Sequence, residues 1–143
     1  MPRAFTQEWV EELAKRCHTD EEFNEEADGF DRTVTLHILA DPDRGVLEDR
    51  WVGFNPPQMT DLWAGADNEK ATTSDYIIEG TYADWHAVNE RTKGLVASLL
   101  DQSILLRAGK TSYIAMFVPG VDRFFELSKG ITDSYDGDYE RKN

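Results

Sequence analysis

The stretch from Thr73 to Phe117, TSDYIIEGTYADWHAVNERTKGLVASLLDQSILLRAGKTSYIAMF, decides the fold because its polarity pattern changes period several times. Short β-branched and aromatic runs that end in glycine are typical of half-buried strands, whereas apolar residues three or four positions apart are typical of helices. The pattern predicts a strand, two helices, a strand and a helix, at residues 73–80, 81–93, 95–100, 103–109 and 110–118.

Local signals support the two helices in the middle of this stretch. Thr81 and Asp84 form a capping-box pair that can satisfy free backbone N–H groups at a helix start. The next helix places four apolar residues on one face: Leu95, Val96, Leu99 and Leu100. The stretch has no Ser/His/Asp grouping, no phosphate-binding glycine loop and no Cys/His ligand spacing. Its apolar helix faces beside a sheet suit a container for an apolar molecule, but they suit an ordinary core as well.

Two helices are predicted upstream of the central stretch. In residues 5–17 an apolar residue recurs at every fourth position, which indicates an amphipathic helix. Thr19 and Glu22 are expected to form the capping box of a second, shorter helix. Its apolar side chains should point inward: Phe23, Ala27 and Phe30.

Strands are predicted between these helices and the central stretch. Residues 33–40 alternate strictly, as expected of an antiparallel strand with one covered face. A turn at 41–45 closes a hairpin with a return strand at 47–54, residues 59–64 form a third short strand, and 65–70 form a polar loop.

The C-terminal part is expected to contribute little. Pro119-Gly120 should break the helix at 110–118, so that residues 121–128 add only a last apolar turn or two. Residues 130–143 have almost nothing to bury, and we expect a mobile tail after a single domain at 1–129. The fold class is α+β: a five-stranded, mostly antiparallel sheet covered by helices, in the order helix-helix-strand-strand-strand-strand-helix-helix-strand-helix-helix.

Size and charge exclude several function classes. The chain has 143 residues, enough for one domain with a real core, and its single cysteine, Cys17, cannot form an internal disulfide. We therefore expect a cytoplasmic protein without an export leader or a membrane span. The formal net charge of −13 argues against nucleic acid as a partner and against strong attraction to anionic lipid. Adaptation to high salt is an alternative explanation of the acidity.

In element order and local strings the chain resembles the sterol carrier protein type 2 (SCP-2-like) family. The resemblance covers residues 5–129 and is carried by the helix pair at 5–30, the hairpin at 33–54, SDYIIEG with TYADW at 74–85, and SILLRAGKTSYIAMF at 103–117. It implies a non-catalytic lipid-transfer protein without a cofactor, whose sterol, fatty acid, fatty acyl-CoA or phospholipid ligand lies in a hydrophobic tunnel between sheet and helices. The C-terminal Arg141-Lys142-Asn143 departs from the peroxisomal members, because it is not a peroxisomal address.

By position, the resemblance implies a tunnel lined from the first helix, the central helix pair, the last strand and the closing helices. The expected ligand-binding residues are Trp9, Leu13, Trp85, Leu99, Leu100, Leu106, Ile114, Phe117 and Phe124. Partners would be the lipid or sterol itself, at most a transient membrane contact, and in one reading a second copy of the chain.

Other candidate chemistry is weaker. The three histidines, His18, His37 and His86, show no metal-ligand spacing, and His86 would be the one to test as a general base of a small hydrolase or isomerase. Asp133 to Glu140 resemble a calcium loop in composition, but their ligand register is wrong. Cys17 lies on an apolar helix stripe, where an inert buried thiol is expected. A further alternative is an accessory module that docks on an enzyme, or on itself, through its apolar helix face.

Overall fold

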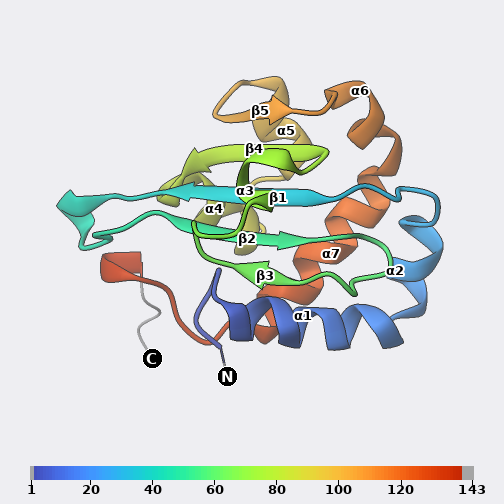
Figure 1. Cartoon of the computed structure of the whole chain (residues 1–143), viewed down its shortest axis with the longest axis horizontal. Helices are drawn as coiled ribbons and strands as arrows, with labels where there is room; N and C mark the ends of the chain where they lie inside the picture. Colours follow the sequence, from blue (N-terminus) through green and yellow to red (C-terminus); the bar gives the residue numbers. More distant parts are fainter. Residues whose placement is uncertain (1, 140–143) are drawn as a thin grey trace.

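The computed structural model describes residues 2–139, which form one sheet with helices on both faces and along one edge (Figure 1). The strands lie in the order β3-β2-β1-β4-β5. Their bounds are β1 Val34–Leu39, β2 Arg50–Phe54, β3 Trp63–Ala64, β4 Tyr76–Thr81 and β5 Ile104–Ala108. The larger helices are α1 Gln7–Thr19, α2 Glu21–Glu26, α4 Tyr82–Asn89, α5 Leu95–Leu100 and α7 Val118–Ile131. The short elements are α3 Lys70–Thr73, α6 Thr111–Ile114 and the 3₁₀ turns η1 Pro42–Arg44, η2 Ala115–Phe117 and η3 Gly137–Tyr139.

The sheet confirms the predicted fold class, with one parallel pair. β1 lies at its centre, antiparallel to β2 and parallel to β4, and β4 is antiparallel to β5. A parallel pair needs a long crossover, and here residues 50–75, which include β2, β3 and α3, return the chain to the same end of the sheet.

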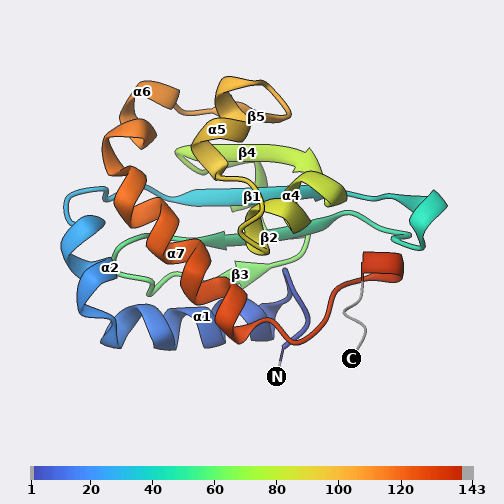
Figure 2. The same ribbon diagram turned by 180° about the vertical axis from the view of Figure 1, so that it is seen from behind.

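The helices are unevenly distributed over the sheet. α4, α5 and α7 cover one face, as Figure 2 shows, while α3 lies on the opposite face. α1 runs along the edge beyond β3 and contacts α7, β2 and β3. The main core therefore lies between β1, β2, β4 and the layer that contains α7.

The second face of β1 is covered as well, which corrects the prediction of a strand with one covered face. Thr35 is completely buried, and its hydroxyl donates to the Ser74 Oγ at 2.8 Å. His37, on the face of β1 that was expected to be uncovered, stacks on Trp51 with ring centroids 3.4 Å apart, and its Nε2 lies 2.8 Å from an Asp49 carboxylate oxygen. These polar side chains can be buried because each has a hydrogen-bond partner.

Proline and glycine at 119 and 120 do not end a helix, so that prediction was wrong. α7 begins at Val118 and continues for 14 residues, with Pro119 in its first turn. Proline is favoured there because the first N–H groups of a helix have no intrahelical acceptor. The helix carries the apolar stripe that the sequence assigned to only a turn or two.

The segment after α7 is packed against the domain, and the expectation that it buries almost nothing is wrong through residue 139. Tyr135 is completely buried and Tyr139 is 6% exposed. Thr132 Oγ1 accepts hydrogen bonds from Trp9 Nε1 at 2.9 Å and from Asn89 Nδ2 at 3.0 Å. Polar composition misled the prediction, because the tyrosine rings are buried while their hydroxyls are hydrogen bonded. Glu140, in the calcium-like run, and Arg141-Lys142-Asn143 lie outside the described residues.

Smaller differences concern element ends. Asp20, not Thr19, caps α2, since its carboxylate accepts from the Phe23 N–H at 2.8 Å. The return strand begins at Arg50, and the third strand has two residues instead of six. Part of the expected loop and strand at 65–80 is the short helix α3. The Thr81–Asp84 cap of α4 is confirmed, with Thr81 Oγ1 accepting from the Asp84 N–H at 3.1 Å.

Candidate functional site

An apolar cavity lies between the sheet and the helix layer. Its floor comes from inward-facing positions of three neighbouring strands: Val34 and Leu36 on β1, Phe54 on β2 and Ile78 on β4. Leu36 pairs directly with Ile78 across the parallel ladder. The period of two in each strand therefore aims one row of side chains at the cavity.

The walls and roof of the cavity come from the helices. Phe23, Ala27 and Phe30 form one wall, from α2 and the turn after it. Leu95 of α5, Ile114 of α6 and Phe117 of η2 line it from the side of β5, and α7 contributes Gly120, Val121, Phe124 and Phe125. Phe117 and Val121 are half-buried, so they mark where the cavity meets the surface.

The cavity is narrow in this structure. Its volume is about 50 Å³, which is room for a few water molecules, since each needs roughly 10–15 Å³. Pockets that bury a drug-sized ligand measure roughly 300–1,000 Å³. A long hydrocarbon chain could enter only if the surrounding elements moved apart.

The elements that cover the cavity on the side of β5 are short and weakly capped. α6 has four residues, η2 has three, and neither α5 nor α6 has a side-chain cap at its N-terminus. Isolated helices of this length are not stable in water and depend on tertiary packing. Ile114 and Phe117 therefore lie on the part of the cavity wall whose displacement costs the least free energy.

Three of the nine expected ligand-binding residues line this cavity: Ile114, Phe117 and Phe124. Trp9, Leu13 and Trp85 are completely buried in the core outside its lining, and Leu99 is 8% exposed. Leu106 is partly buried against the core. Leu100, expected on the inner face of its helix, is 72% exposed, because α5 turns Leu95, Ser98 and Leu99 inward instead.

Sequence reasoning placed Phe23, Ala27 and Phe30 inside the molecule but missed their part in the cavity, and it missed the strand residues of the floor. Each of these side chains has the signal of an ordinary core residue, an apolar position on an inward stripe. Only the packing of distant elements distinguishes a cavity wall from a filled core.

Gly120 allows α7 to approach α2 closely beside the cavity. A Cβ atom there would lie 2.9 Å from the Glu26 carbonyl oxygen. We expect Gly120→Ala to lower the free energy of unfolding by about 1–2 kcal/mol, since overpacking outweighs the gain in helix propensity. Gly130→Ala, on the same helix in open space, should stabilise by roughly 0.5–1 kcal/mol. Urea denaturation of both variants tests this, and equal effects would contradict the close packing.

A charged pair also joins α2 to α7 at this wall. Arg123 Nη2 and Nε donate to the two Asp20 carboxylate oxygens at 2.6 and 2.9 Å. These hydrogen bonds, with that from the Phe23 N–H, hold the pKa of Asp20 below its usual value. Since the pKa is lowered by folding, the stabilisation is present above the unfolded pKa of about 3.9 and is lost as pH falls through the folded pKa.

Asp20→Asn keeps a capping oxygen but removes the charge. We expect it to lower the free energy of unfolding at pH 7 by about 1 kcal/mol, because a solvent-screened pair contributes little more. The difference between wild type and variant should vanish as the pH falls below the folded pKa. Unfolding curves at several pH values measure it, and a difference that persists in acid would contradict the pairing.

The other candidate residues do not form a reaction centre. Burial, with Asp20 nearby, raises the pKa of the Cys17 thiol to about 12, so it stays protonated at neutral pH. His86 lies against the rings of Tyr135 and Tyr139, away from the cavity lining. Within residues 2–139, no three His, Cys, Asp or Glu side chains are arranged to hold a metal ion. None of the helices in that range combines the length and apolar character needed to cross a bilayer.

Comparisons with known proteins identify the fold. No protein-family model and no curated protein sequence matches the chain. Among solved structures, a crystal structure of sterol carrier protein 2 matches with a TM-score of 0.77 at 17% identity, over 89% of this chain and 98% of the other. The solution structure of a conserved hypothetical protein from Thermus thermophilus, described as possibly a sterol carrier protein, matches with a TM-score of 0.79 at 17% identity, over 91% and 90%.

A third neighbour is described with a ligand. The solution structure of palmitated SCP2L2 from Aedes aegypti matches with a TM-score of 0.54 at 14% identity, over 79% of this chain and 90% of the other. These similarities establish that the chain has the fold of sterol carrier protein 2.

Proposed function

We propose that this chain, which has the fold of sterol carrier protein 2, is a carrier that binds the hydrocarbon part of a sterol, fatty acid, fatty acyl-CoA or phospholipid between its sheet and its helices. The observation that carries the proposal is the cavity, which fifteen residues line with almost purely apolar side-chain surface. The neighbour named as palmitated supports a fatty acid as one such ligand.

Binding requires the cavity to enlarge. Each methylene group transferred from water into an apolar site contributes about 0.8 kcal/mol, so a chain of a dozen methylenes offers roughly 10 kcal/mol. Displacing α6 and η2 and immobilising the ligand offset part of this gain. Bound ligand would therefore hold α6 and η2 away from the sheet, whereas the cavity is narrow without it. The affinity depends on the length of the hydrocarbon chain more than on any polar contact.

The experiment is displacement of a fluorescent fatty acid by unlabelled fatty acids of increasing length. We expect the dissociation constant to fall by roughly threefold to fourfold for each added methylene until the cavity is full. Mass spectrometry of protein purified without denaturation should detect co-purified lipid. The proposal is refuted if no lipid co-purifies and no probe is displaced at any chain length.

The chemistry of the cavity wall supports a carrier over an enzyme. Among the lining residues, every side chain is hydrocarbon or hydrogen, so none can transfer a proton or act as a nucleophile. We expect ligands recovered from the protein to be chemically unchanged.

A further inference from the structure

An arginine with an unused hydrogen-bond donor lies just after α4. Arg91 Nη2 lies 3.3 Å from an Asp122 carboxylate oxygen on α7, and 24% of the Arg91 side chain is exposed. Among the buried side-chain nitrogen and oxygen atoms of residues 2–139, Arg91 Nη1 is the one without a hydrogen-bond partner. An unpaired donor on a buried charged group costs free energy, so its presence in a folded protein calls for an explanation.

The backbone at Arg91 is one that glycine would adopt at lower cost. Arg91 has a φ of 65° and follows Glu90, the C-cap of α4. The Thr92 N–H donates to the Ala87 carbonyl at 3.0 Å and the Arg91 N–H donates to the Val88 carbonyl at 3.2 Å. This is the Schellman pattern, in which the residue at the left-handed position is usually glycine. We therefore expect the Arg91 side chain to have a use beyond ending the helix.

The pair with Asp122 places Arg91 next to the mouth of the cavity. Residues three and four apart are neighbours on a helix surface, so Val121, Asp122 and Phe125 share one patch of α7. Val121 and Phe125 line the cavity, and Val121 is half-buried where the cavity meets the surface. Leu95, four residues after Arg91, lines the cavity from α5, and α7 contacts both α4 and α5 (Figure 2).

The polar head of a bound amphiphile must stay at this mouth. The side chains that line the cavity are all hydrocarbon or hydrogen, so a carboxylate inside it would lose its hydration without gaining a partner. The net charge of −13 also repels an anionic ligand as it approaches. An anionic headgroup therefore needs a cationic donor beside the mouth.

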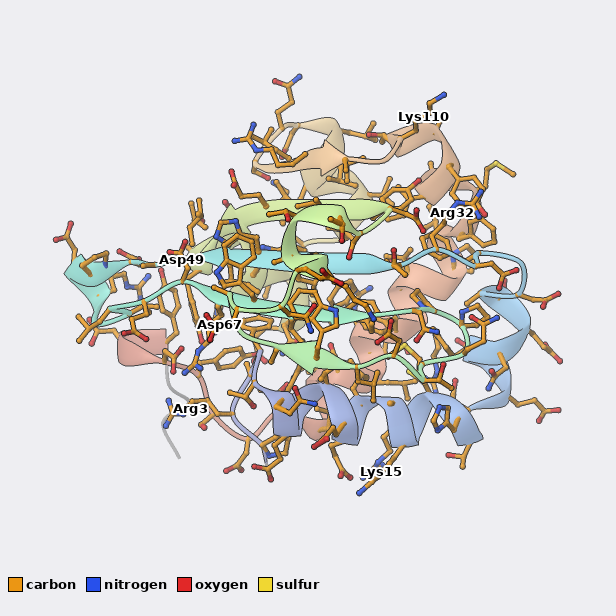
Figure 3. All side chains as sticks on the ribbon, in the orientation of Figure 1. Arg3, Lys15, Arg32, Asp49, Asp67 and Lys110 are labelled. Carbon is orange, nitrogen blue, oxygen red and sulfur yellow. The ribbon has the colours of Figure 1, made fainter. Side chains whose placement is uncertain are left out.

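Another cation near the cavity is already engaged. Arg32 Nη1 donates to the carbonyls of Asp31 and Phe30 at 3.0 and 3.4 Å. Its guanidinium group lies 4.6 Å from the centre of the Tyr113 ring. Figure 3 shows Arg32 at the end of the molecule that also carries α2 and α6. Arg32 thus brings the same charge close to the lining residue Phe30, but the buried unpaired donor belongs to Arg91.

We propose that Arg91 is the headgroup-binding residue of the cavity, and that the ligand is a long-chain fatty acid whose carboxylate accepts a hydrogen bond from Arg91 Nη1. This inference rests on the proposed carrier function and narrows its ligand, because the hydroxyl of a sterol makes a weaker hydrogen bond with a guanidinium group than a carboxylate does. Asp122 competes for the same guanidinium group. Its side chain is 42% exposed, so it can turn to water at little cost when the ligand carboxylate binds.

The experiment compares dodecanoic acid with dodecan-1-ol, which have the same chain length, as displacers of the fluorescent fatty acid at neutral pH. The ratio of their dissociation constants, alcohol over acid, measures headgroup recognition and cancels the affinity of the fluorescent probe. We expect Arg91→Gln to lower this ratio at least about tenfold, because a hydrogen bond between charged groups is lost. The dissociation constant of the alcohol should change by less than about twofold.

Two further variants serve as matched controls. Arg32→Gln removes the same charge near the cavity and should change the ratio by less than about twofold, since a solvent-screened charge contributes little. Asp122→Asn removes the competing carboxylate and should raise the ratio roughly threefold. The opposite signs at Arg91 and Asp122 distinguish headgroup binding from a structural ion pair, because loss of either partner of a structural pair would affect acid and alcohol alike.

The remaining outcomes separate this inference from the carrier function. Equal losses for the acid and the alcohol in Arg91→Gln, or equal changes of the ratio in Arg91→Gln and Arg32→Gln, would overturn the assignment of Arg91. If both ligands displace the probe with the same ratio in wild type and Arg91→Gln, the carrier function stands and the headgroup site is refuted. If neither ligand displaces the probe from the wild type, both proposals are refuted.

Discussion

A chain that ends after Lys129 is expected to lose at least about 5 kcal/mol of its free energy of unfolding. The truncation removes Tyr135 and Tyr139, both buried, and loss of one buried aromatic side chain costs roughly 3–5 kcal/mol. It also removes the hydroxyl of Thr132 that accepts from Trp9 and Asn89 in the interior. Because whole domains are stable by only about 5–15 kcal/mol, the shortened chain should be largely unfolded or close to it.

Urea denaturation followed by tryptophan fluorescence and circular dichroism measures this loss. A chain that ends after Thr132 keeps the Thr132 hydroxyl but lacks Tyr135 and Tyr139. Its free energy of unfolding should therefore lie between those of the full chain and of the chain that ends after Lys129. Asp133→Ala is the control, since this exposed side chain lies in the same segment and should change stability by less than about 0.5 kcal/mol. Stability within about 1 kcal/mol of the full chain after truncation at Lys129 would show that the domain ends there.

Val121→Trp is expected to weaken fatty acid binding roughly 50-fold. Val121 lines the cavity where it meets the surface, so an indole ring there takes the place of about three methylene groups of the ligand. At about 0.8 kcal/mol per methylene, the loss is roughly 2.4 kcal/mol. Stability should change by only about 1 kcal/mol, because a half-buried position lets the larger ring reach toward solvent.

Leu127→Trp provides the matched control for this substitution. Leu127 is also half-buried on α7, and it packs against the core outside the cavity lining. Displacement of the fluorescent fatty acid should therefore be nearly unchanged in this variant. If both tryptophan variants weaken binding equally, the ligand does not enter beside Val121.

The sequence predicted those elements whose pattern is local. α1 follows from apolar residues at every fourth position, and β1 follows from strict alternation. The burial of Thr35 and His37 could not be predicted in the same way, because their partners Ser74, Asp49 and Trp51 lie elsewhere in the chain. A polar side chain is expected at the surface only when no residue from elsewhere in the chain can form a hydrogen bond with it in the interior.

The C-terminal third shows why breakers and composition can mislead. Proline usually interrupts a helix, yet Pro119 is compatible with α7 because it lies in the first turn. In the sequence, only the apolar run at 121–128 could have indicated that a helix begins at this proline. Tyr135 and Tyr139 stand among acidic residues and glycine, so the average polarity of the segment hid two buried rings.

The candidate site was predictable in kind but only partly in its residues. Resemblance in element order indicated a space between helices and sheet, and Ile114, Phe117 and Phe124 do line one. Trp9 and Trp85 were expected in the tunnel from their positions in the resemblance, but each has an indole N–H that donates to an interior oxygen. Such an anchored ring holds elements together, and the cavity lies beside smaller or more adaptable side chains.

The first residues of the described chain are hydrogen bonded to the segment that follows α7: the Ala4 N–H donates to the Ser134 carbonyl at 2.9 Å, and the Asp133 N–H donates to the Pro2 carbonyl at 2.9 Å. Figure 1 shows both ends of the described chain on the side of the molecule away from β5, so a fluorescent reporter or surface tether fused at either end would lie on that side. Protein immobilised through that side would leave the β5 edge of the sheet facing away from the support, so fatty acid exchange could be followed without obstruction by the tether.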